Sequence, residues 1–64
     1  MKKSELIELD KQIQVIKQAA AELKKLSNGI QAVDRNADRV LASVKMLEIN
    51  VSDVLDFVTD QTFP

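Results

Sequence analysis

A seven-residue repeat of apolar side chains is the feature that most constrains how this chain can fold. From residue 6 to residue 23 the apolar positions are separated by alternating steps of three and four residues: Leu6, Leu9, Ile13, Ile16, Ala20 and Leu23. Such spacing places the side chains on one face of an α-helix. The repeat therefore predicts an amphipathic helix over residues 5–27. Ser4 is the expected N-cap, and Lys24 and Lys25 would lie at the negative end of the helix dipole.

A second repeat with the same spacing predicts a second helix, over residues 31–58. Its apolar positions are Leu26, Ile30, Val33, Ala37, Val40, Val44, Leu47, Val51, Val54 and Val58. Leu41 and Leu55 lie beside the repeat and widen the apolar stripe, which is typical of a helix in a bundle. No segment of useful length alternates with the two-residue period of a strand, so the predicted fold class is all-α.

The two repeats are out of phase where they meet, at Ser27-Asn28-Gly29. Gly29 is the only glycine, and glycine readily adopts the left-handed conformation that ends many helices. Asp34 is the best candidate for the next N-cap, with Ser27 and Asn28 as alternatives. The sequence therefore predicts one helical-hairpin domain over residues 1–64, with its turn at Asn28 and Gly29. The alternative is one long helix in a coiled coil, because glycine inside a helix costs only about 1 kcal/mol.

A turn centred on residue 29 predicts which residues meet across the hairpin, since residue i would then lie opposite residue 58 − i. Ile13 would face Val44, and Ala20 would face Ala37. The basic residues near the N-terminus would lie alongside acidic residues of the second helix, namely Asp53, Asp56 and Asp60. Exposed ion pairs of this kind would select the orientation of the helices more than they would stabilise them.

The small size of the chain predicts self-association. A 64-residue chain buries only about 60% of its unfolded surface, and small domains usually need disulfides, a metal or a partner chain. The sequence has neither cysteine nor histidine, so a disulfide is impossible and an ordinary zinc site is not expected. We therefore predict that the hairpin pairs with a second copy as a four-helix bundle homodimer. The self-association seam would contain the first repeat, the second repeat from Val33 onward, and Leu41 and Leu55.

The sequence offers no set of residues suited to catalysis or to a cofactor. Nucleophilic catalysis lacks a partner base without histidine or cysteine, and one glycine cannot form a phosphate-binding loop. Asp34 and Asp38 are one helical turn apart, as are Asp53 and Asp56, but both pairs lie off the apolar stripe. We expect these carboxylates to be solvated rather than buried, and the protein to be neither an enzyme nor a metal or cofactor carrier.

One basic patch keeps an RNA-binding alternative open. Arg35 and Arg39 are one turn apart and form a small patch with Lys45, although Asp34 and Asp38 are interleaved with them. A surface lattice of ion pairs is the expected arrangement, and no aromatic side chain is available there to stack on bases. By length and helical pattern alone, the chain resembles the Rop-type plasmid copy-number regulators. That resemblance implies a four-helix bundle dimer that binds RNA.

Two further features set expectations about location and partners. The N-terminus becomes polar at once and no apolar run approaches the roughly 20 residues of a membrane span, so a cytoplasmic protein that does not bind membranes is expected. Residues 59–64 read as a frayed acidic tail, and Phe57 and Phe63 are candidate docking residues for another protein. The predicted function is protein–protein interaction in an accessory or adaptor role, without catalysis.

Overall fold

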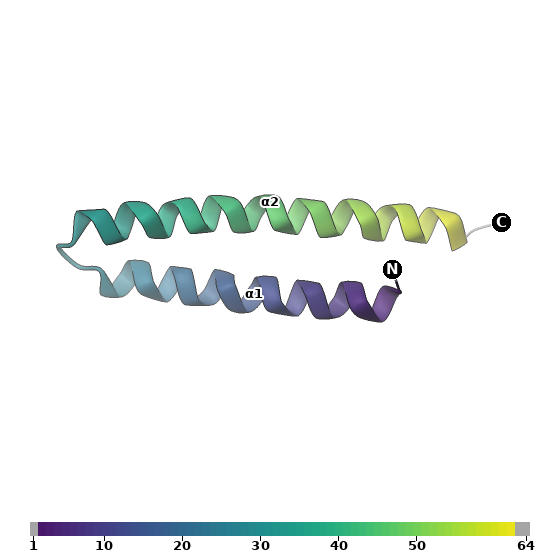
Figure 1. The fold of residues 1–64 in the computed structure, drawn as a ribbon, viewed down its shortest axis with the longest axis horizontal. Helices are drawn as coiled ribbons and strands as arrows, with labels where there is room; N and C mark the ends of the chain where they lie inside the picture. Colours follow the sequence, from purple (N-terminus) through teal and green to yellow (C-terminus); the bar gives the residue numbers. More distant parts are fainter. Residues whose placement is uncertain (1, 63–64) are drawn as a thin grey trace.

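Two helices packed as an antiparallel hairpin make up the protein. The computed structural model describes the backbone of residues 2–62 and the side chains of residues 2–57. Helix α1 spans Lys3–Leu26 and helix α2 spans Gln31–Thr62. They lie side by side, joined by a short turn at one end (Figure 1). This confirms the predicted hairpin and shows that the alternative of one continuous helix is wrong.

The helix ends differ from the predicted ones by a few residues. Helix α1 starts two residues early, with Lys2 rather than Ser4 at its N-cap position. Lysine has no acceptor, so the polar contact at this end comes from Glu5, whose carboxylate accepts a hydrogen bond from the Lys2 backbone N–H at 3.3 Å. Helix α2 starts at Gln31 as predicted but runs to Thr62. Of the tail predicted over residues 59–64, residues 63 and 64 lie outside the described part of the chain.

The turn depends on a glycine in a conformation that other residues rarely adopt. Gly29 has a φ of 93° and is the only described residue with a positive φ. The Ile30 backbone N–H donates to the Ser27 carbonyl at 2.6 Å, which closes the turn. The Ser27 hydroxyl is buried and donates to the Lys24 carbonyl at 2.8 Å, so one of the free carbonyls at the end of α1 gains a donor.

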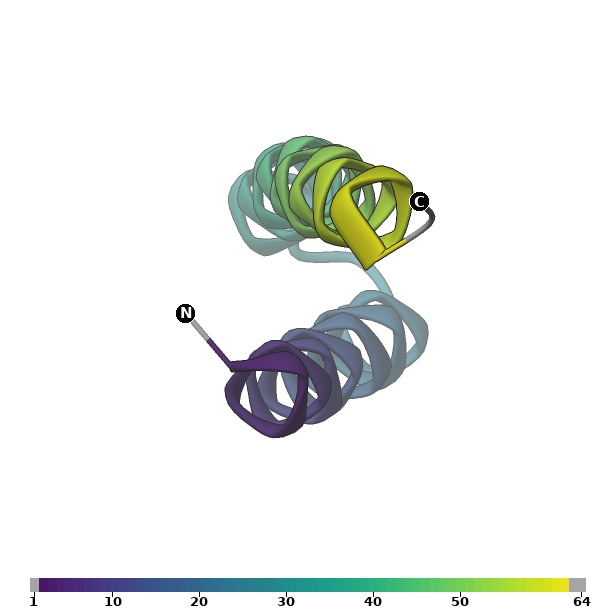
Figure 2. The same cartoon turned by 90° about the vertical axis from the view of Figure 1, so that its right-hand side faces the viewer.

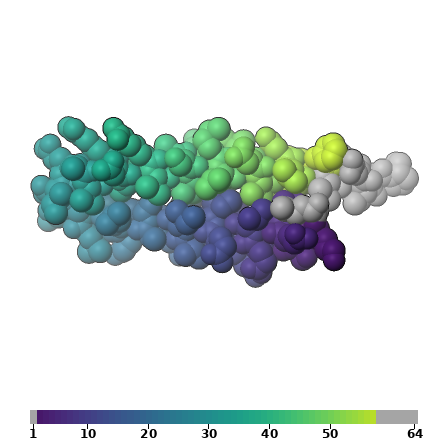
Figure 3. All heavy atoms as spheres, in the orientation of Figure 1, coloured from purple at the N-terminus to yellow at the C-terminus, as the bar shows by residue number. Residues whose placement is uncertain are grey.

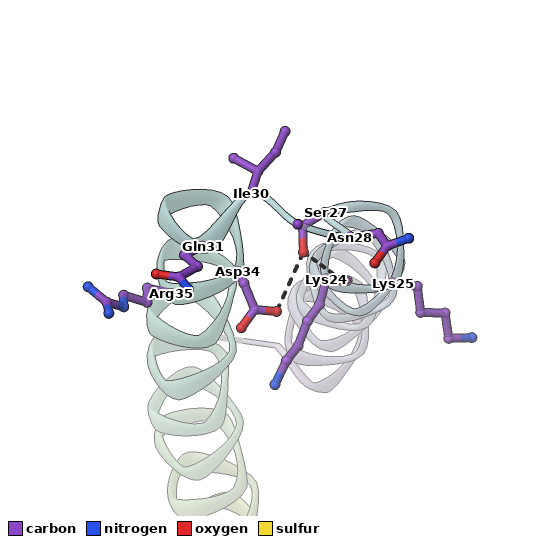
Figure 4. Close-up of a pocket in the computed structure, with 9 residues that line it drawn as sticks. Lys24, Lys25, Ser27, Asn28, Ile30, Gln31, Asp34 and Arg35 are labelled. Carbon is purple, nitrogen blue, oxygen red and sulfur yellow. Dashed lines mark hydrogen bonds between the residues drawn. The ribbon is translucent and has the colours of Figure 1, made fainter.

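Asp34 does not cap α2 as predicted. The Ile30 carbonyl already accepts the Asp34 N–H at 3.1 Å, so Ile30 occupies the N-cap position and Asp34 lies in the first turn of the helix. The Asp34 carboxylate instead comes within 3.5 Å of the Ser27 hydroxyl. Figure 4 shows Asp34 and Ser27 pointing toward each other between the two helix ends. The negative charge is still near the positive end of the α2 dipole, where it is stabilising.

The hairpin is a single layer with an unusually large surface. Viewed along its length, α1 and α2 lie side by side, and no other described segment covers either side of the pair (Figure 2). The Cα radius of gyration is 15.2 Å, against about 11 Å for a compact domain of this length. The accessible surface is 5166 Å², whereas a compact 7.2 kDa protein exposes about 4,100 Å². The chain thus exposes roughly 1,000 Å² more than a compact monomer of its mass.

The apolar contacts agree with the predicted register, since Ile13 clusters with Val44, but the long polar side chains meet one helical turn away from it. The Gln14 side chain contacts Glu48 rather than residue 44, and Lys24 contacts Asp38 rather than residue 34. The reason is that helical side chains lean toward the N-terminus of their own helix. Side chains of α1 lean away from the turn and those of α2 lean toward it. An α2 residue whose polar side chain contacts α1 therefore has its Cα further from the turn than the Cα of its α1 partner. Ile13 itself belongs to one buried cluster with Val44, as predicted, and with Val51.

Replacing Gly29 by alanine tests the turn. We expect Gly29→Ala to lower the free energy of unfolding by about 1 kcal/mol per chain, because a Cβ is disfavoured at positive φ. No neighbouring atom lies within 4 Å of where that Cβ would be, so the loss would be conformational rather than steric. Gly29→Asn is the matched control, since asparagine tolerates this conformation better. Thermal melts at equal concentration would contradict the turn geometry if Gly29→Ala melted higher than the parent.

Candidate interaction surface

The predicted apolar seam is divided into a buried half and an exposed half. One residue in each seven-residue repeat is buried between the helices: Leu6, Ile13, Ala20, Ala37, Val44 and Val51. The other position of each repeat stays between 40% and 47% exposed, and we call these residues the open face: Leu9, Ile16, Leu23, Val40, Leu47 and Val54. Contact between α1 and α2 extends along the hairpin (Figure 3), yet it covers only half of the seam.

The open face forms one apolar groove along one side of the hairpin. Near the open end of the hairpin, Leu9 and Ile16 of α1 and Leu47 and Val54 of α2 line the same hollow. Toward the turn, Ile16 and Leu23 line a second hollow with Val40. Ile16 lines both, so the two hollows are neighbours along the hairpin. Side chains from both helices therefore build a surface that neither helix could offer alone.

The side chains that line the groove carry no charge. Gln12 and Asn50 border the groove near the open end, and Ala19 borders it toward the turn. Asn36 and Ser43 lie two heptads and one heptad before Asn50, on the same side of α2. A covering protein would therefore remove few charges from water, and stripping water from charges is the main cost of burying a polar surface.

The opposite side of the hairpin is closed by polar contacts between the helices. The Gln14 amide donates to the Glu48 carboxylate at 2.8 Å, and the Lys17 ammonium donates to the same oxygen at 3.2 Å. These two contacts, the Gln14 hydrogen bond first, hold the pKa of Glu48 below its ordinary value of 4.5. Half-buried Leu41 and Leu55 lie on this side, and Leu55 packs against the Ile13 cluster.

A second ion pair joins the helices close to the turn. The Lys24 ammonium lies 2.6 Å from the Asp38 carboxylate. This hydrogen bond, together with the charge of Asp38, raises the pKa of Lys24 above 10.5. Figure 4 shows Lys24 pointing toward the space between the helices, while Lys25 and Arg35 point outward. Both partners are about half exposed, so the pair orients the helix ends more than it stabilises them.

The remaining seam residues and the expected end-to-end ion pairs are placed differently. Val33 is half-buried near the turn, and the Val58 side chain lies outside the described residues. Ion pairs across the described part of the hairpin join Lys17 to Glu48 and Lys24 to Asp38. None of the ion pairs among the side chains of residues 2–57 involves Asp53 or Asp56, which the predicted register placed beside the basic N-terminal segment. The Asp60 side chain lies outside the described residues.

The basic patch is exposed, but the expected ion-pair lattice does not form around it. Arg35, Arg39 and Lys45 are all exposed on α2. Asp34 and Asp38 turn toward Ser27 and Lys24 of the other segment rather than toward the arginines. Within the described side chains, the Arg39 guanidinium donates only to Asn36, at a long 3.5 Å. Neighbouring carboxylates therefore neutralise the positive charge of this patch less than the sequence suggested.

Neither a metal-binding cluster nor a membrane-spanning stretch occurs among the described residues. Among those residues, acidic side chains do not gather in any group of three that could hold a metal ion. Neither helix, over its described length, has a stretch long and apolar enough to cross a membrane. Phe57 is 60% exposed near the end of α2, whereas Phe63 lies outside the described part. The open face, by contrast, extends over both helices.

Comparison with known proteins adds no further information about this surface. No protein family matches the chain, and neither a curated protein nor a solved structure matches it. The role of the open face is therefore argued from its own composition and geometry.

The Glu48 contacts predict how stability depends on pH. Because the pKa of Glu48 is lower in the folded state, its contacts stabilise the fold above pH 4.5 and are lost as the pH falls below that value. We expect the parent to lose more stability than Glu48→Gln between about pH 6 and pH 3, because the variant lacks this titration. Melting temperatures across that range measure the difference. Equal slopes for the two proteins would show that the contacts do not persist in solution.

Proposed function

We propose that the protein is a non-catalytic interaction module that pairs with a second copy of itself through the open face. The observation that carries this proposal is the split seam: residues with the spacing of a bundle core remain 40–47% exposed along one side of the hairpin. Four-helix bundles bury both positions of such a repeat, one against the neighbour in the hairpin and one against the other pair. In the single hairpin, only the position that faces the neighbouring helix is buried.

The size of the face suits a stable dimer. The hairpin is about 15 Å across, and α1, with 24 residues, is about 36 Å long. The projected area is then roughly 500 Å², and the ridged accessible surface of such a face approaches the ~800 Å² per partner of ordinary interfaces. A second copy would also cover most of the roughly 1,000 Å² that the hairpin exposes beyond a compact monomer. An accessory or adaptor role in the cytoplasm is part of this proposal.

A second candidate function is RNA binding by the same dimer, through Arg35, Arg39 and Lys45. The observation in its favour is that these exposed cations form no ion pair among the described side chains. Against it, the patch has only three cations and no aromatic side chain, whereas RNA recognition usually combines charge with stacking. We therefore rank RNA binding below self-association.

Leu47 and Ile49 offer a matched pair of substitutions on one helix. They are 41% and 44% exposed, but Leu47 lines the groove and Ile49 lies on the other side, near Glu48 and Ser52. We expect Leu47→Glu to weaken dimerisation by at least about 3 kcal/mol, more than 100-fold, because the lost leucine occurs twice per dimer. Ile49→Glu should leave it nearly unchanged. Sedimentation equilibrium at micromolar concentration measures both.

Either of two results would contradict self-association through the open face. The first is a well-folded parent that sediments as a monomer at micromolar concentration. The second is a dimer that Ile49→Glu and Leu47→Glu weaken equally. Equal effects would mean either that the interface lies elsewhere or that both substitutions act by disturbing the packing of the helices. Circular dichroism of each variant, at the concentration used for sedimentation, establishes that the helices are intact.

Binding to structured RNA separates the two candidate functions. At about 150 mM salt we expect no detectable binding below roughly 100 μM, because three exposed cations release few counterions. Fluorescence anisotropy with a labelled RNA hairpin measures this. Micromolar, salt-sensitive binding that is lost in the Arg35→Ala/Arg39→Ala double variant would instead favour the RNA-binding function.

A further inference from the structure

We propose that the two copies pair with their turns at opposite ends of the bundle. This inference rests on the proposed self-association through the open face and specifies its geometry. A second copy can cover the groove in two symmetric ways, with the two turns at the same end or at opposite ends. The apolar layers and the charges of the hairpin bear differently on this choice.

The apolar layers alone do not discriminate between the two arrangements. Along α1 the open face reads Leu9, Ile16, Leu23, and along α2 it reads Val40, Leu47, Val54, so each series is symmetrical about its middle member. In both arrangements the layer of Ile16 and Leu47 packs against the same layer of the second chain. The outer layers contain one leucine and one valine each, and they match equally well whichever way the second copy is turned.

Charge is what distinguishes the two ends of the hairpin. Near the open end, five acidic side chains face three basic ones: Glu5, Glu8, Asp10, Asp53 and Asp56 against Lys2, Lys3 and Lys11. Glu48 and Lys17 lie near the middle and pair with each other. Near the turn, four basic side chains face three acidic ones: Lys24, Lys25, Arg35 and Arg39 against Glu22, Asp34 and Asp38. The open end is thus acidic and the turn is weakly basic.

This difference favours opposite ends. Turns at the same end would bring two acidic ends together, whereas turns at opposite ends place each acidic end on the basic turn of the other copy. One contact at the rim illustrates the match. Arg39 and Asp53 lie seven residues before and after Met46, next to the central Leu47 layer. With α2 antiparallel to its own copy, Arg39 of one chain falls beside Asp53 of the other.

Pulsed electron paramagnetic resonance with single spin labels decides the orientation, and the absence of cysteine makes such labelling simple. The label is placed at Gln31→Cys, an exposed site at the start of α2. Gln31 is sixteen residues from Leu47, so opposite turns predict a separation of about 48 Å, at 1.5 Å per residue in each copy. Turns at the same end predict about half that distance or less, because the labels would be separated only by the width of the bundle.

Met46→Cys is the control, because it lies next to the centre and gives a short distance in both arrangements. A short distance at both sites, with a dimer in sedimentation, would overturn the proposed orientation while leaving self-association intact. A monomer in sedimentation, with no dipolar coupling at either site, would overturn the proposed function and the orientation together. A long distance for Gln31→Cys and a short one for Met46→Cys is the expected result.

Discussion

The packing of one buried residue per heptad between α1 and α2 is the interaction on which the rest of the structure depends. It uses Leu6, Ile13 and Ala20 of α1 and Ala37, Val44 and Val51 of α2. Two of these six are alanines, whose small side chains let the helices come close near the turn but bury little apolar surface. The contact is long and thin, and it is only one side chain deep. That is enough to hold two helices side by side, and it is why half of the apolar seam stays in contact with water.

The two sides of the contact between α1 and α2 have different chemistry, and this difference makes one side better suited to a partner than the other. On one side Gln14, Lys17 and Glu48 bridge the helices, and their charges need to remain near water. On the other side the groove is apolar and is bordered by the amides of Gln12 and Asn50. A partner that covered the first side would have to strip water from an ion pair, whereas a partner on the second side would mainly displace water from leucine, isoleucine and valine. The hairpin therefore has one face suited to solvent and one suited to a partner.

Much of the fold could be predicted from the sequence, because its strongest signals are local. The heptad spacing predicted both helices, and the phase slip beside Gly29 predicted the turn, where the glycine has a φ of 93°. The caps were predicted wrongly at Ser4 and Asp34, since the helices begin after Lys2 and Ile30, whose side chains are not capping groups, and a cap signal in the sequence fixes a helix start only approximately. Counting from the turn predicted the Ile13–Val44 contact, but it placed the polar contacts of Gln14 and Lys24 one turn off because it ignores the lean of the side chains. Which half of the seam is buried could not be predicted, because both halves have the same spacing and only the rotation of each helix about its axis separates them.

The split seam also links the stability of this chain to its proposed function. In a large domain the residues that bind a partner can be separate from those that form the core, so either set can change without the other. Here Leu9, Ile16 and Leu47 have the spacing of core residues and the exposure of binding residues. Covering them would complete the second layer of a core that one hairpin leaves open, and binding to the folded state alone stabilises that state. In a chain of 64 residues that cannot form disulfides, the stability of the fold and the strength of association would then both depend on the open-face side chains.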